Sequence, residues 1–121
     1  MLKRLTSATI WSQDLNNLLP FYRDTLGLKV GMQSERFVAF GESEDAPILG
    51  LGSHSEVKGN ASDPHRHMVG FESDDLDADY RRLTSAGVEF IEQPTEYDGM
   101  RIATLRDPEG NLVQLFQPSR Q

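Results

Sequence analysis

Histidine, carboxylate and cysteine side chains hold most metal ions in proteins, and this sequence offers few suitable arrangements of them. It has three histidines, His54, His65 and His67, and no cysteine. The lack of cysteine excludes disulfides, thiol catalysis and sulfur-ligated metals. His65 and His67 lie close enough in sequence to form a ligand pair, but they follow Asp63-Pro64 at the entrance of a predicted strand. We interpret them as partly exposed histidines, because histidine often remains in contact with solvent.

Three other side chains could take part in chemistry or ligand binding. Glu72 could serve as a base or as a metal ligand, although a charged strand end in solvent explains it equally well. Arg101 could hold an anionic ligand or pair with a residue on a neighbouring strand. Trp11 is the only tryptophan. Its ring could stack on a flat ligand together with Phe116, or pack in an ordinary core.

The composition is that of a small acidic domain. The 121 residues are 37% hydrophobic, and 12 basic against 19 acidic residues give a net charge of -7. This length suits one compact domain. The basic residues are scattered along the chain, which argues against nucleic acid and anionic membranes as partners. No stretch approaches the roughly 20 apolar residues of a membrane span, so we expect a cytoplasmic protein.

The elements that must position these side chains begin with a βαβββ half. Its strands are expected over residues 5–12, 28–34, 36–41 and 47–53. Asn16 or Asn17 is the expected cap of a helix that holds Pro20 in its first turn and ends at Gly27. The acidic segment 42–45 is predicted to form the turn between the last two strands.

A second βαβββ half follows a polar linker at residues 54–64. Its strands are expected over residues 67–73, 88–92, 100–106 and 112–117. Asp74 or Asp75 is expected to cap a helix over residues 76–86, which Gly87 ends.

The last hairpin contains the clearest turn signal. Asp107 can take the first position of a type I turn, and Pro108 presets φ at the second. Gly110 then supplies the positive φ that returns the chain as a strand.

Capping, helix-stop and strand signals recur in step along the two halves. Asp14-Leu15 matches Asp75-Leu76 at an offset of about 60 residues, and the glycines that end the two helices match as well. The repeat predicts a single domain of two βαβββ modules, at about residues 1–56 and 65–121.

Four runs of residues resemble the vicinal oxygen chelate superfamily, which includes glyoxalase I, extradiol dioxygenases, fosfomycin resistance enzymes and bleomycin-binding resistance proteins. The runs are Asp14-Leu15, Phe21–Leu28, Phe71–Leu76 and Asp107–Leu115. The resemblance covers nearly the whole chain. It implies an α+β fold in which two βαβββ modules form a curved mixed sheet around a cavity. It also implies a homodimer whose chains both contribute to that cavity.

Strand alternation then places the candidate residues other than Arg101 on one side of the sheet. Matching the two halves pairs Ser7 with Met68 and Gly50 with Gln114. The predicted ligand-binding residues are Ser7, Thr9, Trp11, Gly50, Gly52, Met68, Glu72, Arg101, Gln114 and Phe116. Because glycine has no side chain, we expect Gly50 and Gly52 to leave an unfilled volume beside Trp11.

The resemblance further implies that metal-dependent members place their ligands at the positions of Ser7, Gly50, Met68 and Gln114. In this chain these positions offer a hydroxyl, no side chain, a thioether and a neutral amide. No carboxylate among them offsets the charge of an ion, so we predict that the protein binds no metal and no other cofactor.

The sequence is therefore interpreted as a small-molecule binding protein of the bleomycin-resistance kind, with a small aromatic ligand and no metal. One alternative is a metal-dependent lyase or dioxygenase with rearranged ligands. Another is a scaffold or regulatory dimer whose cavity is closed by its own side chains.

Overall fold

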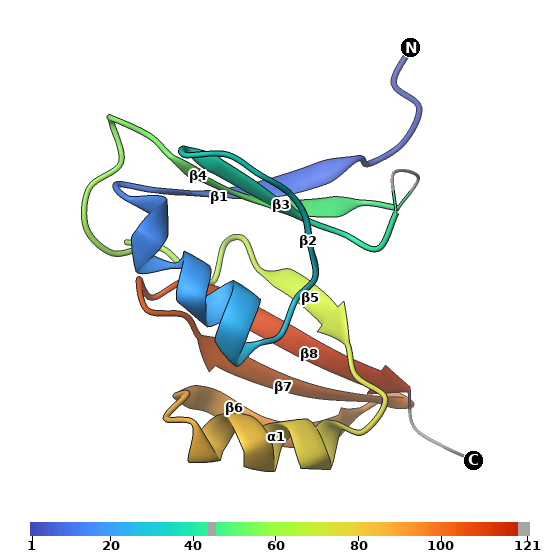
Figure 1. The fold of residues 1–121 in the computed structure, drawn as a ribbon. Coiled ribbons are helices and arrows are strands. Elements are labelled where there is room, and N and C mark those ends of the chain that lie inside the picture. Colours follow the sequence, from blue (N-terminus) through green and yellow to red (C-terminus); the bar gives the residue numbers. More distant parts are fainter. Residues whose placement is uncertain (44–45, 119–121) are drawn as a thin grey trace. The chain divides into compact units, whose positions relative to one another are not determined.

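The computed structural model describes residues 1–43 and 46–118, which divide into two compact units. Unit 1 is Met1–Gly59 and unit 2 is Asn60–Gln121, so the boundary lies within the segment 54–64. Each unit has its own four-stranded sheet and helical segment (Figure 1). No helix in the described ranges is long and apolar enough to cross a membrane.

The sheet of unit 1 contains all four predicted strands, with shorter bounds. They are β1 (Ser7–Ser12), β2 (Val30–Gln33), β3 (Phe37–Phe40) and β4 (Ile48–Ser53). Their order is β1-β4-β3-β2, with β1 parallel to β4 and the other neighbours antiparallel. One face buries Val38, Leu49 and Leu51, each contributing about 1.5–3 kcal/mol. Of the acidic turn predicted at 42–45, residues 44–45 lie outside the described residues.

Two short helical turns replace the single helix predicted for unit 1. They are η1, a 3₁₀ turn at Leu15–Asn17, and η2, a π-helical segment at Pro20–Thr25. The predicted cap at Asn16 or Asn17 is wrong, because Asp14 is the N-cap of η1. Its carboxylate accepts a hydrogen bond from the Asn16 N–H over 3.0 Å. An aspartate in this place satisfies a backbone donor that the turn itself leaves unpaired.

Pro20 accounts for the break between η1 and η2. Proline has no N–H and its ring clashes with a preceding helical turn, so it fits at the start of a helical segment. Pro20 is the first residue of η2, and the N–H of its C-cap, Leu26, donates to the Phe21 carbonyl over 2.8 Å. Gly27, with a φ of +79°, ends the segment as predicted.

Unit 2 repeats the same order of elements with a regular helix. Its elements are β5 (Val69–Glu72), α1 (Leu76–Ser85), β6 (Phe90–Tyr97), β7 (Met100–Arg106) and β8 (Leu112–Pro118). The sheet order is β5-β8-β7-β6, with β5 parallel to β8. Helix α1 buries Leu76 and Leu83, while the sheet buries Ala103, Leu105, Val113 and Leu115. Two mixed four-stranded sheets confirm the predicted α+β fold of two βαβββ modules.

Strand β6 is longer than the strand predicted at residues 88–92. It remains paired with β7 as far as Tyr97. The sequence misleads here because Pro94 resembles a strand breaker. Proline is tolerated at a bulge on an outer strand, where its missing N–H disrupts no regular pairing.

One of the two outer strands of each sheet is interrupted by shifts in register. β2 shifts against β3 between Val30 and Met32. β6 shifts against β7 between Phe90 and Glu92, and again between Glu92 and Thr95. An extra residue in one strand bends that strand and increases its local twist.

The turn before β8 has the predicted geometry. The Gly110 N–H donates to the Asp107 carbonyl over 3.0 Å, and Gly110 has a φ of +82°. The buried Asp107 carboxylate accepts hydrogen bonds from the Glu109 N–H at 2.8 Å and from the Asn111 N–H at 2.9 Å. The turn therefore fixes the start of β8 through its own hydrogen bonds.

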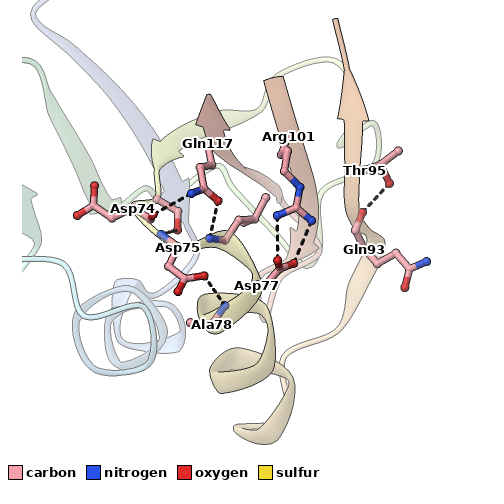
Figure 2. Close-up of polar contacts among 10 residues, drawn as sticks. Asp74, Asp75, Asp77, Ala78, Gln93, Thr95, Arg101 and Gln117 are labelled. Atoms are coloured by element: carbon pink, nitrogen blue, oxygen red, sulfur yellow. Dashed lines mark hydrogen bonds and ion pairs between the residues drawn. The ribbon is translucent and has the colours of Figure 1, made fainter. Parts of the chain in front are cut away.

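The internal repeat extends to single hydrogen bonds at the helix starts. In unit 1 the Leu15 N–H donates to Ser53 Oγ over 2.9 Å. In unit 2 the matching Leu76 N–H donates to Gln117 Oε1 over 2.8 Å (Figure 2). The last strand of each module thus supplies a side chain that anchors the first helical residue. Asp75 caps α1 by accepting from the Ala78 N–H, as Asp14 does for η1.

Candidate functional site

Five predicted site residues share one face of the sheet in unit 1. The bond from Leu15 to Ser53 places η1 on the Ser53 side of β4. Alternation then places Gly50 and Gly52 on the opposite side. In the register, Thr9 lies beside Gly50 and Trp11 beside Gly52. We call this side the helix-free face of unit 1; its residues are Ser7, Thr9, Trp11, Met32, Phe37, Ala39, Ile48, Gly50 and Gly52.

An aromatic cluster forms at one end of this face. The ring centroid of Trp11 lies 6.2 Å from that of Phe37, with the planes tilted by 47°. The rings of His54 and Trp11 make a T-shaped contact, with centroids 5.6 Å apart and an angle of 75° between their planes. The Trp11 side of the cluster is open, since Trp11 remains 46% exposed.

The prediction of an unfilled volume beside Trp11 is wrong. A Cβ atom added to Gly52 would lie 2.4 Å from Cζ3 of Trp11, and one added to Gly50 would lie 2.6 Å from Cζ of Phe37. The two rings therefore rest on the glycines and occupy the room that the missing side chains leave. An aromatic ring laid over a strand glycine protects the backbone there, so the glycines serve to seat the rings.

Four of the predicted residues belong to the corresponding helix-free face of unit 2. Glu72 lies beside Phe116 in the register, and Gly70 lies beside Gln114. Met68 precedes β5 and is half-buried. The ring of Phe116 rests on Gly70, whose added Cβ would lie 2.5 Å from Cε2. Trp11 and Phe116 thus each cover a glycine within their own unit.

Arg101 lies on the other face of unit 2, apart from the other predicted residues. Its register partner on β8 is Gln117, the residue that anchors α1. The Arg101 guanidinium donates to both carboxylate oxygens of Asp77 on α1, at 3.1 and 2.9 Å (Figure 2). These hydrogen bonds lower the pKa of Asp77. The ligand contact predicted for Arg101 has no support in this geometry, because its guanidinium is bound to the helix.

The donor atoms at the predicted metal positions do not suit a divalent ion. Within unit 1 the positions are Ser7 and Gly50, and within unit 2 they are Met68 and Gln114, with no carboxylate or imidazole among them. In the described ranges, no three histidine, aspartate or glutamate side chains are grouped so that they could hold a metal. Hard divalent ions prefer charged or imidazole ligands, so the side chains at these four positions do not form the ligand set of such a centre.

Phe37 and His54 are the cluster residues that the sequence interpretation missed. Phe37 lies beside Gly52 in the register of β3 and β4, so a hairpin alignment of 36–41 with 47–53 was the signal for it. His54 directly follows β4, and its backbone N–H donates to the Ser12 carbonyl over 2.8 Å. That bond continues the β1–β4 ladder and brings the imidazole to the end of the strand that carries Trp11.

Comparisons with known proteins agree with this architecture. The sequence model of the Glyoxalase/Bleomycin resistance protein/Dioxygenase superfamily matches residues 4–115 of this chain. "Uncharacterized protein YwbC" of Bacillus subtilis (strain 168) is 26% identical over 133 residues, covering 97% of this chain and 99% of YwbC.

Solved structures show the same fold. A glyoxalase/dioxygenase from Nostoc punctiforme has a TM-score of 0.79 and 16% identity, covering 98% of this chain and 92% of its own. TnmS3, an antibiotic binding protein from Streptomyces sp. CB03234, has a TM-score of 0.77 and 23% identity, covering 98% of both chains.

Proposed function

Because the chain belongs to the glyoxalase/bleomycin resistance protein/dioxygenase superfamily, we propose that it binds a small, flat aromatic molecule without a metal ion. The observation that carries the proposal is the half-exposed Trp11, held by Phe37 and His54 on the helix-free face of unit 1. A ring stacked on an indole gains about 0.5–1.5 kcal/mol beyond the area that it buries.

The surface around Trp11 favours an uncharged aromatic group. Apart from the His54 imidazole at its end, the helix-free face of unit 1 carries only apolar, glycine and hydroxyl side chains. No cation among these residues would balance an anionic ligand, and the net charge of -7 adds a general repulsion. The stacked part of the ligand is therefore expected to be neutral.

The metal-free part of the proposal is supported by the donor set. A hydroxyl, a thioether and an amide offer no negative charge to a divalent ion. The similarity to TnmS3, whose name describes antibiotic binding, offers a precedent for small-molecule binding on this fold.

The test is a titration with 9-fluorenone, a neutral planar ketone, followed by the fluorescence of the single tryptophan. Binding is expected to quench Trp11, because the probe stacks on its exposed ring. Gly52→Ala is expected to weaken binding by about fivefold to tenfold, since the new Cβ displaces the Trp11 ring. Treatment with EDTA is expected to leave the affinity unchanged.

Gly31→Ala is the matched control in the same sheet. A Cβ at Gly31 would make only ordinary contacts, the nearest at 3.6 Å from the Ala39 carbonyl oxygen. It should bind the probe like the unaltered protein. The proposal is overturned if 9-fluorenone fails to quench Trp11, if Gly31→Ala loses as much affinity as Gly52→Ala, or if EDTA abolishes binding.

A further inference from the structure

His54 is held on both sides by its own backbone. Its N–H donates to the Ser12 carbonyl over 2.8 Å, and its carbonyl accepts from the Val57 N–H over 3.2 Å. A side-chain bond completes the restraint, because the Glu56 N–H donates to Nδ1 of the imidazole over 3.1 Å. The ring is therefore fixed by a local turn independently of any ligand.

This turn determines which ring nitrogen carries the proton. Nδ1 accepts a hydrogen bond, so it must present a lone pair. A neutral imidazole has one N–H, which then has to be on Nε2. The two nitrogens occupy separate corners of the ring, so the Nε2–H direction diverges from the bond with Glu56.

The donor lies at the rim of the aromatic cluster. The rings of His54 and Trp11 make a T-shaped contact, with the centroids 5.6 Å apart and the planes at 75°. A molecule stacked on Trp11 would bring its perimeter to the histidine, which is itself half-buried. The stacking surface of Trp11 and the hydrogen-bond donor of His54 are thus adjacent.

We infer that His54 selects ligands that carry a carbonyl oxygen on the edge of a planar aromatic system, by donating a hydrogen bond from Nε2–H. The inference rests on the proposed stacking at Trp11 and adds the ligand class to it. Aromatic ketones and quinones have this combination of a flat apolar face and an acceptor at the rim. A matching hydrocarbon would stack but leave the donor without a partner.

The first test concerns the proton alone and needs no ligand. The ¹⁵N spectrum of the imidazoles is recorded at about pH 9, where histidine side chains are neutral, and His54 is assigned by its loss in His54→Gln. The expected spectrum has a protonated Nε2 and an unprotonated Nδ1. A proton on Nδ1 would overturn the inference, because the Nε2 edge would then only accept hydrogen bonds.

The second test compares 9-fluorenone with fluorene, which lacks the carbonyl. Affinities are measured from the NMR shift of the Trp11 indole N–H. The ratio of the two affinities is expected to fall by about threefold to tenfold in His54→Phe, which keeps an aromatic ring but removes the donor. His54→Gln, whose amide can still donate, should retain part of the preference.

The outcomes separate the two claims. If both compounds bind the unaltered protein and the ratio is the same in His54→Phe, the selection by His54 is disproved while stacking at Trp11 stands. If neither compound shifts the Trp11 indole N–H, the proposed function fails and this inference fails with it.

Discussion

The helix-free faces of the two units have the same strand order and opposite chemistry. In unit 1 the row across the four strands is Thr9, Gly50, Ala39 and Met32. In unit 2 the corresponding row is Gly70, Gln114, Thr104 and Glu92. The first row is small and largely apolar, whereas the second is polar and ends in a carboxylate. Both sheets bury leucines on their other face, so the two units share the chemistry of the helix side and differ in that of the helix-free side.

The glycine and its covering ring also exchange strands between the units. In unit 1 Trp11 of β1 rests on Gly52 of β4, whereas in unit 2 Phe116 of β8 rests on Gly70 of β5. A strand glycine needs a neighbour to cover it, but either strand of the pair can supply the ring. Among the residues that the structure describes, only those of unit 1 add a second ring and an imidazole to this contact, and this difference is why we assign the stacking site to it.

The largest expected loss of stability comes from substitutions in the leucine core, the feature that the two units share. Leu51 in unit 1 and Leu115 in unit 2 occupy matching positions and are 0% and 7% exposed. We consider the variants Leu51→Ala and Leu115→Ala. Each is expected to lower the free energy of unfolding by about 2–5 kcal/mol in urea denaturation followed by circular dichroism. Met32→Ala, at a side chain that is 51% exposed on the helix-free face, is the control and should cost far less. A small loss at either leucine would show that the two cores are not equivalent.

A smaller effect is expected where the two helical segments differ. Asp75→Ala removes the cap of the ten-residue helix α1, and should destabilise the protein by about 0.5–2 kcal/mol. Asp14→Ala removes the cap of a three-residue turn, so its effect in the same denaturation experiment should be smaller. Asp74→Ala is the control, because Asp74 contributes its backbone carbonyl to Gln117. Equal losses from Asp14→Ala and Asp75→Ala would contradict the difference between the segments.

The smallest effect compares two arginine–aspartate pairs. Hydrogen bonds from Arg101 lower the pKa of Asp77, and those from Arg23 lower the pKa of Asp24. A lowered pKa in the folded protein stabilises it above the ordinary aspartate pKa, and this contribution is lost as the pH falls through the folded pKa. Arg101→Met should therefore reduce stability at neutral pH, and its difference from the unaltered protein should shrink on acidification.

Hydrogen exchange separates these two pairs. Arg101 joins β7 to α1 over 2.9 Å, whereas Arg23 and Asp24 are neighbours within η2. Arg101→Met should speed amide exchange along α1, and Arg23→Met should leave it unchanged. Equal exchange in α1 for both variants would mean that the Arg101 pair does not tie the helix to the sheet.

Local signals explain why most of the fold could be predicted from the sequence. The cap at Asp75, the helix stop at Gly87 and the turn from Asp107 to Gly110 each depend on a few neighbouring residues. The π-helical segment after Pro20 could not be predicted, because it depends on how the chain reconnects its hydrogen bonds past a proline. The continuation of β6 through Pro94 depends equally on pairing with a distant strand.

The candidate site could be predicted only as far as strand alternation extends. Alternation correctly placed Trp11 on the face of Gly50 and Gly52, because the side on which a residue points follows from its position within its own strand. It could not show that the rings would fold onto the glycines, since side-chain rotamers follow from the assembled sheet. The face of Arg101 likewise follows from the register of β7 with β8, which no local pattern gives.

The register shifts in β2 and β6 have a consequence for solubility. Each strand lies at the outer edge of its sheet, where unpaired backbone groups could recruit a strand from another molecule. The extra residues bend these edges, and Pro94 removes one donor from β6 altogether. Straightening β6 by deleting its bulges would give a flatter edge that favours intermolecular sheet growth. The irregular β2 and β6 edges are therefore poor templates for pairing with a strand of another molecule.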